Sequence, residues 1–481
     1  MNRRLLAAAL LISTVLAGCS AKPVVETETV TAPETEHITE TTKLETTKAE
    51  TEPSTIESFP GTADDPTANP PEPVYTGGCK ILVASDIHYL SKDLTDLKSA
   101  FQQMVDHDDG KAMPYIWEIT DAFIEKVIEE KPDVLIISGD LTFNGEKDSH
   151  LDIAGKLKEI ESAGVPVIVI PGNHDINNMA ASQFLEEHAM AVSSIFPEEF
   201  ETIYDDYGYS EAVSRDPASL SYVYQINDYT RAMMLDTCQY MPYSQMGGMI
   251  QEGTYDWIEE QMEEAWRLGM NVIPVAHHNL LDESEVYVKD YTIEHSAQLI
   301  DQLESWDVPL FLSGHLHVQH FMRSGEDYGI YEIVTSSVAT PPCQYGVLYY
   351  GDDASFRYHT EALDMEKWAQ DNGSTDENLL NFKEFGVTFT NRVFYNQAQD
   401  EFAENEDKIG LSKTQRDLMA KLYGELNTYY YNGKVYEIRD KAVERPGYQL
   451  WDELGYPSIL AQHLESVVDE GTVDYNVLEA E

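Results

Sequence analysis

The residues of this chain best suited to chemistry are histidines, aspartates and one asparagine that follow short apolar runs. Five such groups occur in order: Asp86-x-His88, Gly139-Asp140, Gly172-Asn173-His174-Asp175, Ala276-His277-His278 and Gly314-His315-x-His317. Carboxylate, amide and imidazole groups together bind divalent ions such as Mn, Fe or Zn. Imidazole and carboxyl groups can also act as general acids and bases. The set therefore predicts a metal-dependent catalytic site.

The apolar runs that precede these groups are typical of buried β-strands. They are short, rich in Val and Ile, and fall at residues 79–84, 133–137, 165–170, 270–276 and 308–313. Helical periodicity between two of them, from residue 116 to 128, predicts a β-α-β arrangement. In an α/β fold, ligands bind at the carboxyl ends of such strands. We therefore expect all five groups to meet at one edge.

This ordered set resembles the calcineurin-like metallophosphoesterase superfamily over roughly residues 80–350. The resemblance implies an α/β fold, a four-layer α/β/β/α sandwich with a dinuclear metal site at the strand ends. The motif Gly-Asp-Leu-Thr-x-Asn-Gly-Glu, residues 139–146, together with Asp-x-His, is most similar to the class III cyclic-nucleotide phosphodiesterase branch. Phe143 stands where purple acid phosphatases carry Tyr, which argues against a tyrosinate–iron site. The Arg of Ser/Thr protein phosphatases is absent from the same motif.

The resemblance implies a role for each residue of the set. One metal ion would be held by Asp86, His88 and His317. The second would be held by Asn173, His277 and His315. Asp140 would bridge the two ions, and His174 would act on the phosphate and its leaving oxygen. Two such ions clamp a phosphate and lower the pKa of a bridging water, so that hydroxide attacks phosphorus.

Several neighbouring residues allow two interpretations. Asp175 either orients His174 or caps a following helix. His278 fits a structural role better than a ligand role, because His277 directly follows the strand. The resemblance to the class III branch implies that Asn144 and His150 lie near the site. Asn144-Gly145 is equally a turn dipeptide, and His150 could simply begin a helix.

Residues 89–121, after the first strand, are an insertion that is first polar and then merges into the predicted helix. Its sequence Asp106-His107-Asp108-Asp109 could reach the site or remain a solvated loop. A second insertion follows residue 175, and we predict a helix over residues 180–195 there. The sequence thus leaves open whether either insertion contributes to the chemistry.

The amino terminus has the pattern of an exported lipoprotein. Two arginines precede an apolar run that ends Leu16-Ala17-Gly18-Cys19, a signal too short to span a membrane stably. It resembles a bacterial lipobox, which implies cleavage before Cys19 and lipid on its thiol. Residues 20–76 are rich in Thr, Glu and Pro and predict a disordered tether. We expect an extracytoplasmic protein anchored to the bacterial cell membrane through Cys19.

The formal charge of −55 argues against nucleic acid as a partner held by charge. We divide the chain into a signal peptide with lipobox (1–19), the tether (20–76), a phosphoesterase domain (77–355) and a helical carboxyl-terminal extension (356–481). The expected partner is a small phosphoester, and the preferred activity is phosphodiester hydrolysis. The alternatives are a phosphomonoesterase or nucleotidase, and a catalytically inactive surface binding module.

Overall fold

The computed structural model describes residues 77–326 and 328–480. They belong to one compact unit, Tyr75–Glu481. The predicted signal peptide, lipobox and tether lie outside the described residues. Within the described part, no helix has the length and apolarity needed to cross a membrane.

The first sheet contains the strands that precede Asp86, Asp140 and Asn173. Strands β1 (Cys79–Ala84), β2 (Val134–Ile137) and β3 (Val167–Val169) are parallel and adjacent. Helices α2 (Ile116–Glu130) and α3 (Lys147–Ser162) connect them. The predicted β-α-β-α-β order is therefore present. Strands β13 (Gln344–Tyr350), β14 (Phe356–Ala362) and β15 (Val477–Ala480) extend the sheet antiparallel beyond β1.

The second sheet contains the strands that precede the His277 and His315 loops. In spatial order the described strands are β11 (His320–Arg323), β12 (Tyr331–Val334), β10 (Leu310–Ser313), β9 (Asn271–Ala276), β8 (Thr230–Leu235), β7 (Tyr222–Gln225) and β6 (Ser214–Arg215). The central four, from β12 to β8, are parallel. Their carboxyl ends therefore lie at one edge of the sheet.

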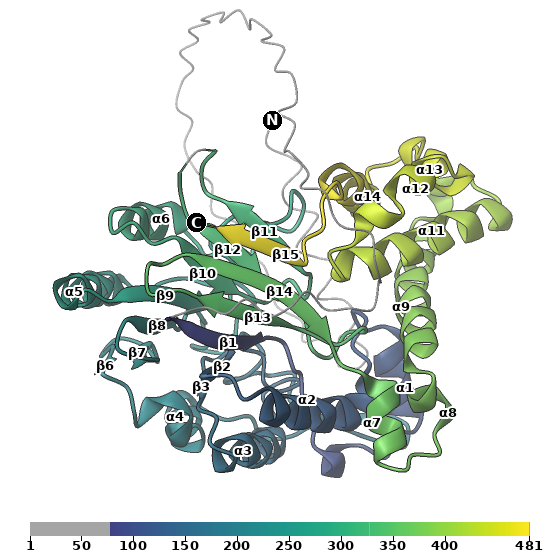
Figure 1. The fold of residues 1–481 in the computed structure, drawn as a ribbon. Helices are drawn as coiled ribbons and strands as arrows, with labels where there is room; N and C mark the ends of the chain where they lie inside the picture. The colour runs from purple at the N-terminus through teal and green to yellow at the C-terminus, as the bar shows by residue number, and fades with distance from the viewer. Residues whose placement is uncertain (1–76, 327, 481) are drawn as a thin grey trace, which may run out of the picture. The chain divides into compact units, whose positions relative to one another are not determined.

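Side-chain alternation explains why the two sheets stack. On β10, Leu310 and Leu312 join the core shared with β1 and α2, whereas Phe311 packs on the opposite face. That opposite face is covered by α5 (Glu252–Leu268) and α6 (Ser296–Glu304). Because both sheets are apolar on two faces, the stable arrangement is the predicted four-layer α/β/β/α sandwich (Figure 1).

The prediction of a helix over residues 180–195 is wrong. This stretch forms a hairpin of β4 (Ser182–Leu185) and β5 (His188–Ala191). Phe184 packs edge-on against Phe101 of α1 (Ser99–Asp106), with ring centroids 6.4 Å apart. The hairpin turn at Glu186 is also hydrogen-bonded to α1, since the Ala100 N–H donates to the Glu186 carbonyl at 2.8 Å. Tertiary packing thus overrides the local helical preference.

The carboxyl-terminal region is helical, as predicted, but it begins and ends in strands. Its helices are α7 (Met365–Asp371), α8 (Glu377–Leu380), α9 (Phe382–Glu404), α10 (Glu406–Ile409), α11 (Lys413–Tyr431), α12 (Arg439–Val443), α13 (Pro446–Asp452) and α14 (Ile459–Glu470). Figure 1 shows them, green to yellow, beside the two sheets. Residue 356, where we expected the extension to start, is the first residue of β14. The chain then returns through β15, which pairs with β14.

Candidate metal centre

The loops at the strand ends bring all seven predicted metal-binding residues together. Two groups of buried side chains could each hold an ion: Asp86, His88, Asp140 and His317 form one, and Asp140, His277 and His315 form the other. Within each group the candidate ligand atoms lie within 4.8 Å of one another. Asn173 joins the second group, since its Oδ1 lies 3.0 Å from His277 Nε2. Asp140 belongs to both groups.

The backbone of these loops is held in an unusual conformation. Five of the seven residues have left-handed φ angles: Asp86 (55°), His88 (49°), Asp140 (49°), His315 (70°) and His317 (60°). Non-glycine residues with such angles cost of order 1–3 kcal/mol each and cluster at functional sites. The fold therefore holds these side chains in place at a cost in backbone energy.

Two glycines allow the loops to approach closely. A side chain on Gly172 would collide with the carboxylate and backbone of Asp140, and one on Gly314 would collide with Ser85 and approach Asp86. No larger residue fits at either position without moving a predicted ligand. This explains why glycine precedes Asn173 and His315 in the motifs.

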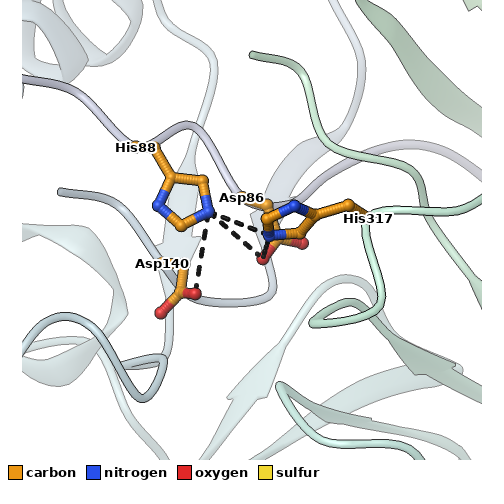
Figure 2. Close-up of side chains that lie close together, drawn as sticks. All are labelled: Asp86, His88, Asp140 and His317. Carbon is orange, nitrogen blue, oxygen red and sulfur yellow. Dashed lines mark hydrogen bonds and ion pairs between the residues drawn. The ribbon is translucent and has the colours of Figure 1, made fainter. Parts of the chain in front are cut away.

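The first group is arranged like a cation site (Figure 2). His88 Nε2 lies 3.0 Å from His317 Nε2, and His317 Nε2 lies 3.3 Å from Asp86 Oδ1. Asp86 Oδ1 and Asp140 Oδ2 are buried and accept no hydrogen bond from the described residues. Buried carboxylate oxygens without donors are costly, and a divalent ion would satisfy both.

The second group shares the Asp140 oxygen. Asp140 Oδ2 lies 3.4 Å from His277 Nε2 and 3.8 Å from His88 Nε2, one histidine from each group. Its other oxygen, Oδ1, accepts a hydrogen bond from the His174 backbone N–H at 2.8 Å. One oxygen of Asp140 is thus fixed by the loop, while the other faces both clusters.

Hydrogen bonds to the far side of three imidazoles set which nitrogen can bind a metal. His277 Nδ1 lies 2.9 Å from the Ser138 carbonyl, and His315 Nε2 lies 3.0 Å from the Asp290 carbonyl. A carbonyl only accepts, so these nitrogens carry a proton and the other nitrogen of each ring is the one that can bind a metal. The Nδ1 of His317 lies 3.1 Å from a carboxylate oxygen of Asp109. Such outer contacts are typical of metal-binding histidines.

The electrostatics of the cluster also suit cations. Burial lowers the pKa of His277, but the carboxylates of Asp140 and Asp86 outweigh it and raise the pKa to about 9. Burial also lowers the pKa of His317, but the carboxylates of Asp109 and Asp86 outweigh it and raise the pKa to about 10. Protons on these imidazoles offset the buried carboxylates. Divalent ions would replace those protons, because metal binding and protonation compete for the same lone pairs.

His174 differs from the predicted ligands in its exposure. Its side chain is 30% exposed, whereas that of Asp140 is 1% exposed. His174 Nδ1 lies 2.8 Å from the Phe143 carbonyl and 2.9 Å from Asn144 Oδ1. Its Nε2 faces the site, 3.9 Å from Asp140 Oδ2. Asn144 therefore lies near the site and holds the His174 ring.

Asp175 neither orients His174 nor caps a following helix, the two roles predicted for it. Its buried carboxylate accepts hydrogen bonds from the backbone N–H groups of Gly172, Leu141 and Thr142, at 2.9, 3.2 and 2.9 Å. Burial and the nearby Asp140 raise the pKa of Asp175 to about 7. Asp175 thus joins the loops after β2 and β3.

His150 and His278 both lie in the interior and act on the loops. His150 Nε2 lies 2.8 Å from the Asp175 carbonyl, and its Nδ1 lies 2.8 Å from the Tyr204 hydroxyl. His278 Nδ1 lies 2.7 Å from Thr237 Oγ1, and its Nε2 lies 2.9 Å from the Met246 carbonyl. Both nitrogens of His278 are therefore engaged, in keeping with a structural role.

The insertion after β1 does reach the site, through a residue other than its histidine. Asp109 contacts His317, whereas His107 lies 3.9 Å from the exposed Asp400 and 48% of its side chain is exposed. Lys111, which the sequence did not single out, is buried and lies 2.6 Å from Asp109 Oδ1. The available signal was a single lysine two positions after an acidic run.

Comparison with known proteins agrees with this geometry. A family model described as calcineurin-like phosphoesterase matches residues 79–319. The chain therefore belongs to the calcineurin-like phosphoesterase family, and it is a phosphoesterase hydrolase. A second family model, described as the C-terminal domain of cyclic nucleotide phosphodiesterase, matches residues 364–474. The buried Asp and His cluster suits a dinuclear divalent metal site.

Solved structures similar to this chain have low sequence identity. A dimetal phosphatase from Danio rerio is 12% identical, with 60% of this chain and 96% of that chain covered and a TM-score of 0.42. GAP50, described as the anchor in the inner membrane complex of Plasmodium, is 13% identical, with coverages of 60% and 89% and a TM-score of 0.35. PhoD is 10% identical, with coverages of 59% and 66% and a TM-score of 0.36.

Proposed function

We propose that this protein hydrolyses a small phosphodiester with two divalent metal ions held on either side of Asp140. The observation that carries the proposal is the pair of buried clusters that share one Asp140 oxygen. The match of residues 364–474 to the C-terminal domain of cyclic nucleotide phosphodiesterase supports a diester over a monoester.

The proposed ligands follow the two clusters. The first ion would be held by Asp86, His88 and His317. The second would be held by Asn173, His277 and His315. When bound, two such ions clamp a phosphate and lower the pKa of a water between them. Asp140 has the geometry of a bridging ligand, because its free oxygen faces both sets.

His174 is proposed as the residue that acts on the phosphate and the leaving oxygen. Its Nδ1 is fixed by Phe143 and Asn144, so that Nε2 points toward the centre. It is partly exposed, as a group that meets a substrate must be. A positioned imidazole can donate a proton to, or hydrogen-bond with, an oxygen on which charge develops.

Substitution of the bridging carboxylate tests the proposal. Asp140→Asn keeps the volume but removes the charge, so we expect at least a 100-fold fall in kcat/KM with bis(4-nitrophenyl) phosphate and loss of bound metal. Turnover is measured with Mn, Fe and Zn supplied in parallel. Asp256→Asn, at an exposed position on α5, is the matched control.

Three results would contradict the proposal. Wild-type turnover in Asp140→Asn would exclude the shared-carboxylate centre. Faster wild-type turnover of 4-nitrophenyl phosphate than of the diester would replace the phosphodiesterase by a phosphomonoesterase. Absence of turnover with every metal would favour the inactive binding module.

We further propose that the mature protein is lipid-anchored outside the cytoplasm. The support is the sequence Leu16-Ala17-Gly18-Cys19 after a short apolar run, and the Thr-, Glu- and Pro-rich composition of residues 20–76. A lipid on Cys19 would give membrane attachment without a spanning helix.

A further inference from the structure

A short segment of the first insertion, Asp106–Lys111, lies against the predicted ligand His317. The Asp109 carboxylate lies between two groups. Its Oδ2 is 3.1 Å from His317 Nδ1, and its Oδ1 is 2.6 Å from Lys111 Nζ. Lys111 is buried and also lies 3.1 Å from Asp108 Oδ1. A buried ammonium thus offsets the charge that Asp109 adds beside the centre.

The contact between Asp109 and His317 has a defined consequence for metal binding. A carboxylate only accepts, so His317 Nδ1 carries a proton and Nε2 is the nitrogen that can bind a metal. That Nε2 lies 3.3 Å from Asp86 Oδ1, inside the first cluster. Outer carboxylates of this kind fix the ring and increase its basicity toward the metal.

Helix α9 of the carboxyl-terminal region holds the same segment from the other side. Asn396 Nδ2 donates to the Asp106 carbonyl at 3.3 Å, and Gln397 Nε2 donates to the Asp108 carbonyl at 3.4 Å. Gly110, with φ +99°, lies against the ring of Phe394, where a Cβ would come within 3.2 Å. The contacts therefore bracket Asp109 on both sides in the sequence.

The segment has little structure of its own with which to stay in place. After α1 ends at Asp106, residues 107–112 form no helix or strand. The His107 N–H donates to the Met104 carbonyl at 3.1 Å at the end of α1. The next backbone hydrogen bond to another part of the fold lies beyond Lys111, where the Ala112 N–H donates to the Ala339 carbonyl at 2.8 Å. The position of Asp109 thus depends on α9 and on the Lys111 ion pair more than on local backbone hydrogen bonds.

We propose that the helical carboxyl-terminal region completes the metal centre: α9 holds Asp106–Lys111 so that Asp109 orients His317. The inference rests on the proposed function. Asp109 is a positioning residue, which acts through His317 and touches no substrate. The helical region thereby acquires a role in metal binding although its helices contribute no proposed ligand.

Binding of Mn²⁺ to the purified full-length protein tests this inference. Titration of the metal-free protein with Mn²⁺ should give two sites in the wild type. Asp109→Ala should weaken one site by about 10–100-fold and leave the other unchanged. Asp109→Asn retains an oxygen that accepts from His317 Nδ1, so it should recover part of the loss. The electron paramagnetic resonance signal of a spin-coupled Mn pair should weaken most in Asp109→Ala and less in Asp109→Asn.

A second variant tests the part played by α9. Asn396→Ala combined with Gln397→Ala removes both side-chain amides that donate to backbone carbonyls of the segment without touching the metal centre, and it should weaken the same Mn²⁺ site. Val387→Ala combined with Thr388→Ala, on the exposed side of α9, is the matched control and should bind Mn²⁺ like the wild type. Circular dichroism verifies that each variant is folded.

The possible results separate this inference from the proposed function. Two unchanged Mn²⁺ sites in Asp109→Ala would overturn the positioning role while leaving the two-metal hydrolase intact. An effect in Asp109→Ala without one in the α9 variant would overturn the role of the helical region. A wild-type protein that binds no Mn²⁺ would overturn both the inference and the proposed function.

Discussion

At the residue scale, the site separates groups that would hold metal from a group that would meet the substrate. The predicted ligands are buried, and the outer nitrogens of His277, His315 and His317 contact carbonyls or a carboxylate. His174 instead is partly exposed, and it belongs to neither cluster. Its removal should therefore affect chemistry without affecting metal content.

We expect His174→Gln to lower kcat by about 100-fold or more, the usual contribution of a positioned acid or base. Both metal ions should remain bound, which elemental analysis of the purified variant would verify. Asn144→Ala provides a graded comparison, because the Phe143 carbonyl still holds the ring at 2.8 Å. Unchanged kcat in His174→Gln would exclude this residue from the reaction.

At the scale of elements, the centre is made by loops that are tied to one another. Asp175 joins the loops after β2 and β3 through three backbone N–H groups. Glu146, at the start of α3, accepts from the Asn144 N–H at 3.0 Å and the Ser182 N–H at 3.4 Å. Glu146 thus links the loop that carries Asn144 to the β4–β5 hairpin.

Glu146 should make stability depend on pH. Burial raises the pKa of Glu146 from 4.5 to about 7. The fold therefore retains a proton that the unfolded chain releases, and this stabilisation is present below pH 4.5 and lost as the pH rises through 7. Glu146→Gln removes the titration. Between pH 4.5 and pH 8 the wild type should lose up to about 3 kcal/mol of unfolding free energy that the variant does not lose.

Urea unfolding at several pH values across this range measures the effect. Glu129→Gln, at an exposed position on α2, is the control and should follow the wild type. Parallel pH profiles for wild type and Glu146→Gln would show that the buried carboxyl does not keep its proton.

At the scale of the whole described unit, the helical region lies between two strands of one sheet. Strand β14 precedes the helices, and β15 follows them. Asn476, just before β15, donates to the Asn432 carbonyl at 3.0 Å and accepts from the Thr360 hydroxyl at 2.6 Å. The helices are therefore fixed to the sheet at both ends, which suits a region that holds a loop of the metal centre.

Membrane attachment through Cys19 can be tested on the chain that includes the predicted signal peptide. In a bacterium that processes lipoproteins, the wild-type chain should appear in the membrane fraction and incorporate labelled palmitate. Cys19→Ala should lose the label, because the thiol is the attachment point. Cys238→Ala, at a buried position of the folded unit, serves as the control for loss of a cysteine. Equal labelling of wild type and Cys19→Ala would refute the proposal.

The sequence determined the strands and the residues at their ends. Runs such as Val134–Ile137 and Leu310–Ser313 are short and apolar, so they form strands buried on two faces. A polar residue directly after such a run must therefore lie at the end of the strand. For that reason the five groups of candidate ligands could be identified before any contact was known.

Only the tertiary structure decided the contacts between segments distant in the sequence. Residues 180–195 have a local helical preference, but packing of Phe184 on Phe101 favours a hairpin. Asp109 and His317 are separated by more than 200 positions, and no pattern near either residue encodes their contact. Strand periodicity is a local property, whereas the partner of a buried charge depends on which surfaces the folded chain brings together.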